Sequence, residues 1–270
     1  QVTATPQAPL LQTIVSDWRP DFVFCLKPGS GYLGGDFFYG EDSKCRALIA
    51  EDEAAALLSE EETPKGYQRA IVTFLLTCAY LKKAESSSTC CFLVHPSLNV
   101  ADHETVERKT RAFLGELAHT ASHEPQLLED LSADALEDLA RTKGGFPPFE
   151  ALRGSFTKAV NNCNVIVLNQ NTPADIDYSE GFNILIGGNS LGRGVTFPAL
   201  QTVYYCRSTK VPQADTMWQH SRMFGYDRDG DLCRVFLPPR LGTHFRNLTE
   251  TNNALFKALA EKGVEGLTLL

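Results

Sequence analysis

The stretch ILIGGNSLGRGVTFPALQTVYYCRSTKVPQADTMWQHSRMFGYDR, residues 184–228, decides the fold of this chain. It opens with an apolar run at 184–186, and a polar loop with Arg193 between two glycines follows. A second apolar run covers 203–206, and a segment with helical character then leads to Arg222. The order strand, polar loop, strand, helix is typical of nucleotide sites at the ends of parallel strands.

Apolar runs and helical patterns alternate over the rest of the chain. Runs typical of buried strands lie at 22–26, 90–94, 165–168, 184–186, 203–206 and 233–237. Helical patterns lie at 67–83, 101–119, 125–141, 149–160 and 248–262, with Asp102 as a candidate N-cap. Short buried strands separated by helices predict an open, mostly parallel α/β sheet with helices on both faces.

The composition is that of a soluble globular protein. The 270 residues are 43% hydrophobic and 21% charged, and no apolar run is long enough to span a bilayer. The chain has eight cysteines without a CxxC pair, and the five that lie inside apolar runs are expected to be buried: Cys25, Cys78, Cys90, Cys91 and Cys206. Free thiols in a reducing cytoplasm fit this pattern better than disulfides or a metal site, and we expect no metal ligands here.

The charge is distributed unevenly along the sequence. A net charge of −8 argues against a protein that coats nucleic acid without specificity. Between residues 193 and 246, however, eight Lys or Arg stand against four acids. The excess acid lies chiefly in 41–62 and 129–138. The basic part therefore contains the stretch quoted above and allows a local nucleic-acid surface.

The chain lacks the motifs that cleave ATP on their own. Hydrolysis requires a phosphate cradle of the GxxxxGK[ST] type and acidic residues that hold Mg²⁺. Neither that pattern nor an apolar strand ending in an Asp-Glu pair occurs in the sequence. The arginine-bearing loop and helix are instead parts that can complete such a site from the opposite side. We therefore expect no independent ATPase activity.

At these motifs the chain resembles the second RecA-like lobe of superfamily-two helicases and translocases. SLGRGVTFPAL is similar to the fifth helicase motif, and QADTMWQHSRMFGYDR is similar to the sixth. With YLGGDFF and FLVHPSLNVADHE, these segments make nearly the whole chain resemble the Z-one domain family. That family comprises bacterial helicase-like proteins of restriction-modification and phage-defence gene clusters. The resemblance implies the C-terminal motor lobe of an ATP-dependent DNA helicase or translocase.

The resemblance also implies a domain organisation and partners. VTATP near the amino end is similar to the third helicase motif, so residues 1–20 would end a preceding lobe or linker. Residues 21–270 would form the helicase C-terminal RecA-like domain, with acidic helical insertions near 41–85 and 120–160. The Walker motifs and the Mg²⁺ ligands would lie on a first lobe upstream of Gln1. The implied partners are ATP with Mg²⁺, single-stranded or duplex DNA, that first lobe, and a nuclease or an ATPase of the MutL and heat-shock-90 type.

The family's functional residues carry over onto matching positions of this chain. Arg222 would be the catalytic arginine that senses the γ-phosphate, and Arg228 would stand in for a second arginine because Gly225 occupies its usual position. The nucleotide would be bound by Gly192, Arg193, Gly194, Thr196 and Gln219, although Thr196 replaces the acid usual at the end of the fifth motif. Nucleic acid would be contacted by His95, Ser97, Asn99, Asn189 and Ser190, of which the first three follow a predicted strand as the fourth motif does.

Two other readings of the sequence stay open. Members of the family are sometimes labelled endonucleases, and Pro20-Asp21 with Asp42-Ser43-Lys44 spells the minimal PD…DxK pattern of an Mg²⁺-dependent nuclease. That DxK lies in a polar loop rather than on a strand. The chain could equally be a non-catalytic DNA-binding or interaction module. In the glycine-dense loop, Tyr32 and Phe37-Phe38 could stack on bases or simply pack in the core.

Overall fold

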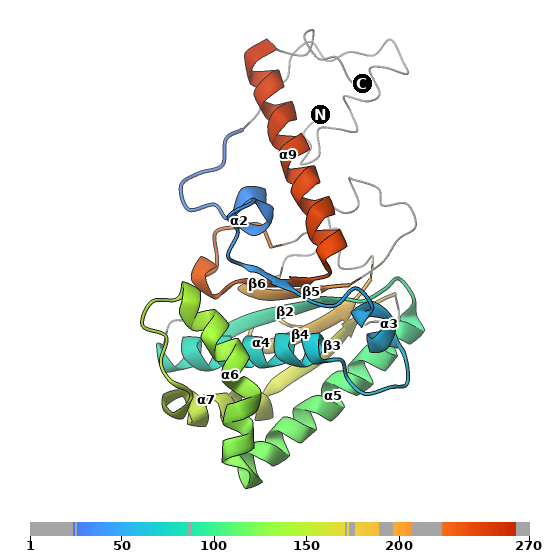
Figure 1. The fold of residues 1–270 in the computed structure, drawn as a ribbon, viewed down its shortest axis with the longest axis vertical. Helices are drawn as coiled ribbons and strands as arrows, with labels where there is room; N and C mark the ends of the chain where they lie inside the picture. Colours follow the sequence, from blue (N-terminus) through green and yellow to red (C-terminus); the bar gives the residue numbers. More distant parts are fainter. Residues whose placement is uncertain are drawn as a thin grey trace.

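The chain folds around one open sheet of six parallel strands, in the order β1-β6-β5-β2-β4-β3 (Figure 1). The computed structural model describes residues 24, 26–85, 88–170, 172, 176–188, 197–206 and 223–262. The strands are β1 (Arg46–Leu48), β2 (Thr89–His95), β3 (Cys163–Leu168), β4 (Gly181–Gly187), β5 (Leu200–Tyr205) and β6 (Arg234–Leu237). The open parallel α/β sheet expected from the sequence is confirmed, and it fits a RecA-like fold.

Helices cover both faces of this sheet. One face carries α3 (Glu53–Leu58), α4 (Lys65–Lys83), α5 (Val100–His123), α6 (Pro125–Thr142) and α7 (Phe149–Asn161). The other face carries α2 (Gly35–Tyr39) and α9 (Pro239–Lys262), while the 3-10 helix η2 (Gly230–Leu232) precedes β6. Figure 1 shows α9 rising away from the sheet, on the side opposite the α4–α7 layer. The sheet is therefore the middle layer of three.

Five of the six expected strands are confirmed near their predicted positions, and one is wrong. Phe24 and Leu26, the two described residues of the strand expected at 22–26, lie outside any strand and are 77% and 81% exposed. The sixth strand is β1, which pairs with β6 at the edge of the sheet. Its sequence, Arg-Ala-Leu, has no apolar run because an edge strand of three residues needs none.

The helices follow the predicted segments with two corrections at their ends. Asp102 is not the N-cap of α5: Asn99 occupies that position, and Asp102 lies in the first turn. The closing helix begins at Pro239 rather than near residue 248, because proline is favoured in a first helical turn. The remaining long helices agree with expectation within a few residues, since their apolar stripes fix them.

Alternate residues of the central strands build two separate cores. On the α4–α7 side, Phe92 of β2, Ile184 of β4 and Tyr204 of β5 are fully buried against the helices. On the α2–α9 side, Leu93 and Leu185 are fully buried with Phe245 of α9, which is 1% exposed. Because both faces of these strands are covered, their sequences read as unbroken apolar runs.

The described cysteines are free thiols, as the sequence predicted. They are Cys45, Cys78, Cys90, Cys91, Cys163, Cys206 and Cys233, and all except half-buried Cys163 are buried. Burial raises the pKa of the Cys45 thiol to about 11 and that of Cys91 to about 12. These thiols are therefore protonated at neutral pH and lie in the core rather than in a reactive site.

Hydrogen bonds and ion pairs attach the acidic helix α6 to the start of β6. Arg234, the fully buried first residue of β6, donates to the Asp138 carboxylate and to the Thr142 hydroxyl at 2.5 and 2.7 Å. Lys143, just past the helix, donates to Asp229 at 2.6 Å. Part of the acidic excess in the predicted insertion is thus used in fixed contacts with the start of β6.

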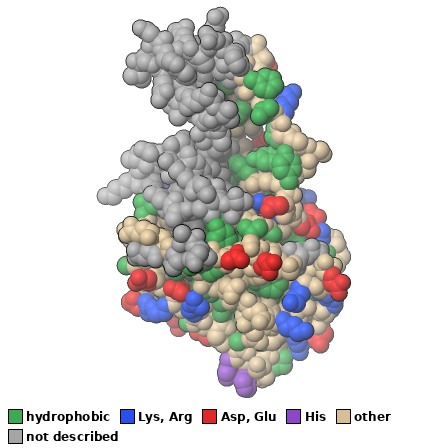
Figure 2. All heavy atoms as spheres, turned by 180° about the vertical axis from the view of Figure 1, so that it is seen from behind, with side chains coloured by type: hydrophobic (Ala, Val, Ile, Leu, Met, Phe, Trp, Pro, Cys, Tyr) green, Lys and Arg blue, Asp and Glu red, His purple; other side chains and the backbone are tan. Residues whose placement is uncertain are grey.

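Charged side chains of both signs are interspersed over the part of the surface visible in Figure 2. The described surface on this face presents no broad patch of a single sign, so any nucleic-acid contact would have to be local. Among the described helices, none combines the length and the apolar character needed to cross a membrane.

Candidate functional site

The order of the strands places a crevice at the carboxyl end of β2. The chain runs from β2 to β3 and β4 on one side, then crosses β2 to form β5 and β6 on the other. Val94 of β2 lies opposite Ile186 of β4, and His95 lies opposite Tyr205 of β5. In open parallel sheets, ligands bind at the carboxyl edge where the strand order reverses. The end of β2 is such a reversal point.

The two segments with helicase-like motifs both begin at this point of the sheet. The fifth-motif segment follows β4, which ends at Gly187, and the sixth-motif segment follows β5, which ends at Tyr205. Most of their predicted site residues lie outside the described residues: Asn189, Ser190, Gly192, Arg193, Gly194, Thr196, Gln219 and Arg222. The described strands nevertheless fix where both segments start, on either side of β2.

The loop after β2 is organised by one hydrogen-bonded cluster. The Ser97 hydroxyl donates to the Asp102 carboxylate at 2.5 Å, and the Asn99 side-chain amide donates to the same oxygen at 3.2 Å. The Asn99 backbone N–H donates to the Ser97 hydroxyl at 2.9 Å. Ser97 is half-buried and Asn99 is exposed, so the structure brings these two predicted residues together at the amino end of α5. This end of the helix carries partial positive charge.

The end of β4, the loop after β2 and the amino end of α5 meet in one corner of the molecule. Gly188 and His103 lie in this corner, although neither was among the predicted site residues. The His103 ring is 2% exposed, and its Nε2 donates to the Ser97 carbonyl at 3.1 Å. Its Nδ1 is buried without a hydrogen-bond partner among the described residues. A Cβ at Gly188 would lie 2.8 Å from the Ser97 carbonyl oxygen and 3.2 Å from His103 Cε1. Glycine therefore lets the end of β4 approach the loop after β2.

The sequence carried a partial signal for this corner. Paired glycines at the end of an apolar run often mark a close backbone approach, and Gly187-Gly188 is such a pair. Nothing in the sequence indicates that His103 is the side chain approached. Asp102, His103 and Glu104 were not expected to share a metal, and they differ in burial: half-buried, buried and exposed, respectively.

His95, the remaining predicted nucleic-acid residue of β2, lies inside the protein. Its ring is 1% exposed and contacts the Tyr205 ring at a centroid distance of 5.0 Å. Its backbone carbonyl accepts from the Cys206 N–H at 3.4 Å. A side chain enclosed in this way is not available to a phosphate at the surface. A contact between His95 and nucleic acid stays a prediction without support from its position.

Arg228 lies at the opposite edge of the sheet. Its guanidinium donates to the Leu200 and Met223 carbonyls at 3.1 and 2.9 Å and to the Asp227 carboxylate at 2.6 Å. Leu200 is the first residue of β5, so Arg228 is separated from the carboxyl edge by roughly 17 Å of strand. The side chain is 5% exposed and its donors serve the fold. The catalytic role predicted for Arg228 therefore receives no support from this geometry.

The Arg228–Asp227 pair gives a prediction for acid stability. Burial alone would raise the pKa of Asp227, but bonds from Arg228 and the Ala199 N–H outweigh it, so the pKa lies below the ordinary 3.8. A carboxyl whose pKa is lower in the folded than in the unfolded state adds to the free energy of unfolding at pH values above its unfolded pKa, near 4. This contribution is lost as the pH falls through the folded pKa. Asp227→Asn should therefore have a lower free energy of unfolding than wild type at pH 7. It should also lose less of that free energy when the pH falls below ~4. Urea unfolding at pH 7, 5 and 3 tests this, and parallel pH curves for the two proteins would contradict it.

A family model described as the Z1 domain matches residues 67–269, which is most of the chain. The chain belongs to the Z1 domain family. The matched region runs from the start of α4 through all the strands except β1 and includes the carboxyl-edge corner. Searches of curated proteins and of solved structures found no match.

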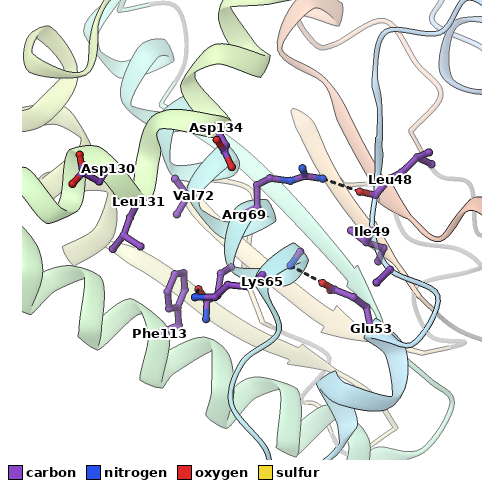
Figure 3. A pocket seen from close by; sticks show the side chains of 13 residues that line it. Leu48, Ile49, Glu53, Lys65, Arg69, Val72, Phe113, Asp130, Leu131 and Asp134 are labelled. Atoms are coloured by element: carbon purple, nitrogen blue, oxygen red, sulfur yellow. Dashed lines mark hydrogen bonds between the residues drawn. The ribbon is translucent and has the colours of Figure 1, made fainter.

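A separate pocket of about 410 Å³ opens on the helical face of this Z1 domain (Figure 3). Figure 3 shows Lys65 and Arg69 of α4 on one side and Asp130 and Asp134 of α6 on the other. Arg69 donates to the Leu48 carbonyl at 2.9 Å. The pocket contains no residue predicted for the nucleotide or the nucleic acid, and its charges of both signs favour no single ligand class.

Glu53 borders this pocket and has a structural role. One carboxylate oxygen accepts from the Gly66 N–H at 2.6 Å, and the other accepts from the Tyr204 hydroxyl at 2.5 Å. A Cβ at Gly66 would lie 2.4 Å from Glu53 Oε1, so glycine is required for this approach. Glu53 thereby joins α3, the first turn of α4 and β5. Its two oxygens are occupied, which argues against a role as a catalytic base.

The DxK part of the nuclease pattern lies where the sequence indicated, in a loop. Asp42 and Lys44 lie in the loop between α2 and β1, not on a strand, and Asp21 lies outside the described residues. The Ser43 hydroxyl between them donates to the Phe38 carbonyl at 2.8 Å. No group of three His, Cys, Asp or Glu gathers within the part of the chain that the structure describes. The loop placement gives the nuclease reading no additional support.

Proposed function

We propose that this Z1 domain is the C-terminal motor lobe of an ATP-dependent DNA helicase or translocase of a restriction-modification or phage-defence system. The observation that carries the proposal is that β4 and β5, the strands after which the two motif-bearing segments begin, lie on either side of β2. The segments thus begin at the carboxyl edge, where the strand order reverses. A strand-tracking motor needs nucleotide and nucleic-acid contacts to meet at one place, and this edge supplies it.

Features of the described corner fit a phosphate-bearing ligand. The amino end of α5 offers positive partial charge, and Gly188 allows the backbone to come close. The bound nucleotide would supply the phosphoanhydride bond whose cleavage drives movement. Arg193, Thr196 and Gln219 would hold it, and Arg222 would place a planar fork of donors on its phosphate oxygens. Mg²⁺ would be held by the acidic residues of a first lobe.

Contacts to the strand would come from the other side of the same corner. Ser97 and Asn99 lie at the end of β2 and are held by Asp102, so their positions depend on α5. Asn189 and Ser190 follow Gly188 directly in the sequence. The Ser97 hydroxyl proton is already given to Asp102, so Ser97 would act by holding the loop, while the Asn side-chain amides and the Ser190 hydroxyl would donate to phosphate oxygens. Phosphate contacts position a protein without reading the base sequence. Tracking along any sequence requires such contacts.

The test is the coupling between strand binding and ATP hydrolysis in the full-length protein. We expect single-stranded or duplex DNA to stimulate hydrolysis. Arg193→Ala, at the residue proposed to link nucleotide and strand, should remove most of the stimulation. Arg108→Ala on the outer surface of α5 serves as the control and should behave as wild type, because Arg108 is 59% exposed and forms an ion pair with exposed Glu60.

Two results would favour the rival functions. Full-length protein with intact Walker motifs but no hydrolysis at any DNA concentration would indicate a binding or interaction module. Plasmid cleavage by this chain with Mg²⁺, lost in Asp42→Ala, would indicate a nuclease. Either result would overturn the motor proposal.

A further inference from the structure

A second hollow lies on the α2–α9 side of the sheet, between the glycine-rich segment 26–37 and the outer half of α9. Its volume is about 850 Å³ and its lining is largely apolar. Four aromatic side chains contribute to it: Tyr32, Phe37, Phe224 and Phe256. Flat rings on several sides of one hollow favour a flat ligand, since offset and edge-on ring contacts are the preferred ones.

The glycine-rich segment is shaped to hold Tyr32 at the mouth of this hollow. A Cβ on Gly34 would lie 2.8 Å from the Tyr32 ring, so glycine is needed beneath it. Gly31 adopts φ +84°, a backbone conformation that other residues resist. Tyr226 supports the ring at a centroid distance of 5.2 Å. Tyr32 nevertheless keeps 36% of its surface exposed, which leaves part of the ring free to contact a ligand.

Polar groups around the hollow suit a base attached to a phosphate. The Asn253 side-chain amide donates to Asp36 at 2.7 Å, while its carboxamide oxygen accepts no hydrogen bond from the described residues. That oxygen can accept from a ring N–H of a base, such as that of thymine, or from an exocyclic amine. Lys27 lines the hollow, and exposed Lys257 shares a helical face with Asn253 and Ala260, which line it too. Two cations are thus available to a phosphate attached to a base in the hollow.

The hollow is continuous with the segment proposed to contact nucleotide. Phe224 lines it and Tyr226 supports it, and both belong to the sixth-motif stretch that contains Arg222. The Leu33 N–H donates to the Gly225 carbonyl at 2.9 Å, and the Gly225 N–H donates back at 3.1 Å. The glycine-rich segment is thus bonded directly to the end of that stretch.

We propose that this hollow binds one unpaired base of the nucleic-acid strand by stacking on Tyr32, with the edge of the base against Phe224, whose ring is inclined at 70° to that of Tyr32. The inference rests on the proposed function, because it assigns a further contact to the same strand. Stacking suits a motor because every base has a flat face and the contact is therefore tolerant of sequence. The bonded segments give the stacked base a physical connection to the residues that follow Arg222.

The test compares a 12-residue oligothymidylate with an oligonucleotide of equal length that carries abasic sites, using fluorescence anisotropy and this chain. Both probes have the same phosphates, so the difference between their affinities reports the bases. Wild type should bind oligothymidylate roughly 5- to 100-fold more tightly than the abasic probe. Tyr32→Ala should lower the affinity for oligothymidylate to the abasic level and leave abasic binding unchanged. Tyr32→Phe should restore the difference.

Leu48→Ala provides the control, because Leu48 is 55% exposed on the edge strand β1 and does not line the hollow. Circular dichroism checks that each variant is folded, and Asn253→Ala offers a second, milder variant of the same hollow. If wild type and Tyr32→Ala bind both probes equally, the stacking proposal is wrong while the motor proposal stands. If neither this chain nor the full-length protein binds any oligonucleotide, both proposals are wrong.

Discussion

Replacing Arg222 with alanine is expected to lower DNA-stimulated ATP hydrolysis by the full-length protein by ~10³- to 10⁵-fold. A guanidinium placed on the transferred phosphate offsets the charge that develops as the bond to the leaving group breaks. Arg222 lies outside the described residues, and the expectation rests on its place in the sixth-motif stretch after β5. The effect should appear in kcat, because this contact is made most strongly in the transition state.

Arg222→Lys separates the shape of the guanidinium from its charge. Lysine keeps the positive charge but offers no planar fork, so it should recover only a small part of the lost rate. DNA affinity and thermal unfolding of both variants should match wild type, since neither variant is expected to disturb the fold. Hydrolysis within a few-fold of wild type in Arg222→Ala would show that another residue supplies this contact.

The central strands could be predicted from the sequence because burial on both faces leaves unbroken apolar runs. β2, β4 and β5 each carry such a run and were placed within a few residues. β1 could not be found in the same way, because a three-residue edge strand needs few apolar side chains. The strand predicted at 22–26 was wrong because Phe24 and Leu26 are apolar in the sequence but exposed in the structure. Apolar composition indicates a strand only where neighbouring elements can cover it.

The sequence motifs predicted which loops form the candidate site, but they did not predict which residues contact one another there. The motif stretches identified the loops after β4 and β5, and the parallel sheet then brought the starts of both loops beside β2. The contact of Gly188 with Ser97 and His103 depends on the register between β2 and β4, which the sequence does not specify. Arg228 resembled a catalytic arginine because of its spacing, yet its guanidinium is bound to carbonyls at the amino edge.

Replacing Arg234 with methionine is expected to cost about 3 kcal/mol of unfolding free energy. Arg234 is fully buried, and its Nε and Nη2 donate to Asp138 and Thr142. Its Nη1 donates to the Cys233 and Asp231 carbonyls at 2.7 and 3.2 Å. Methionine fills a similar space but leaves these acceptors without their donors. The estimate lies at the lower end of the range for broken buried pairs, because Asp138 keeps 30% of its side chain exposed.

Arg141→Ala is the matched control, since Arg141 also pairs with Asp138 but is 49% exposed. An exposed ion pair contributes little, so this variant should lose less than about 1 kcal/mol. Urea unfolding measures both variants, and an unchanged m-value would show that the extent of unfolding is the same. Equal losses in the two variants would mean that the buried guanidinium of Arg234 contributes no more to the attachment of α6 than the exposed one of Arg141. A large loss confined to Arg234→Met would mean that this acidic helix is an integral part of the Z1 domain, because its attachment to the sheet then depends on one buried guanidinium.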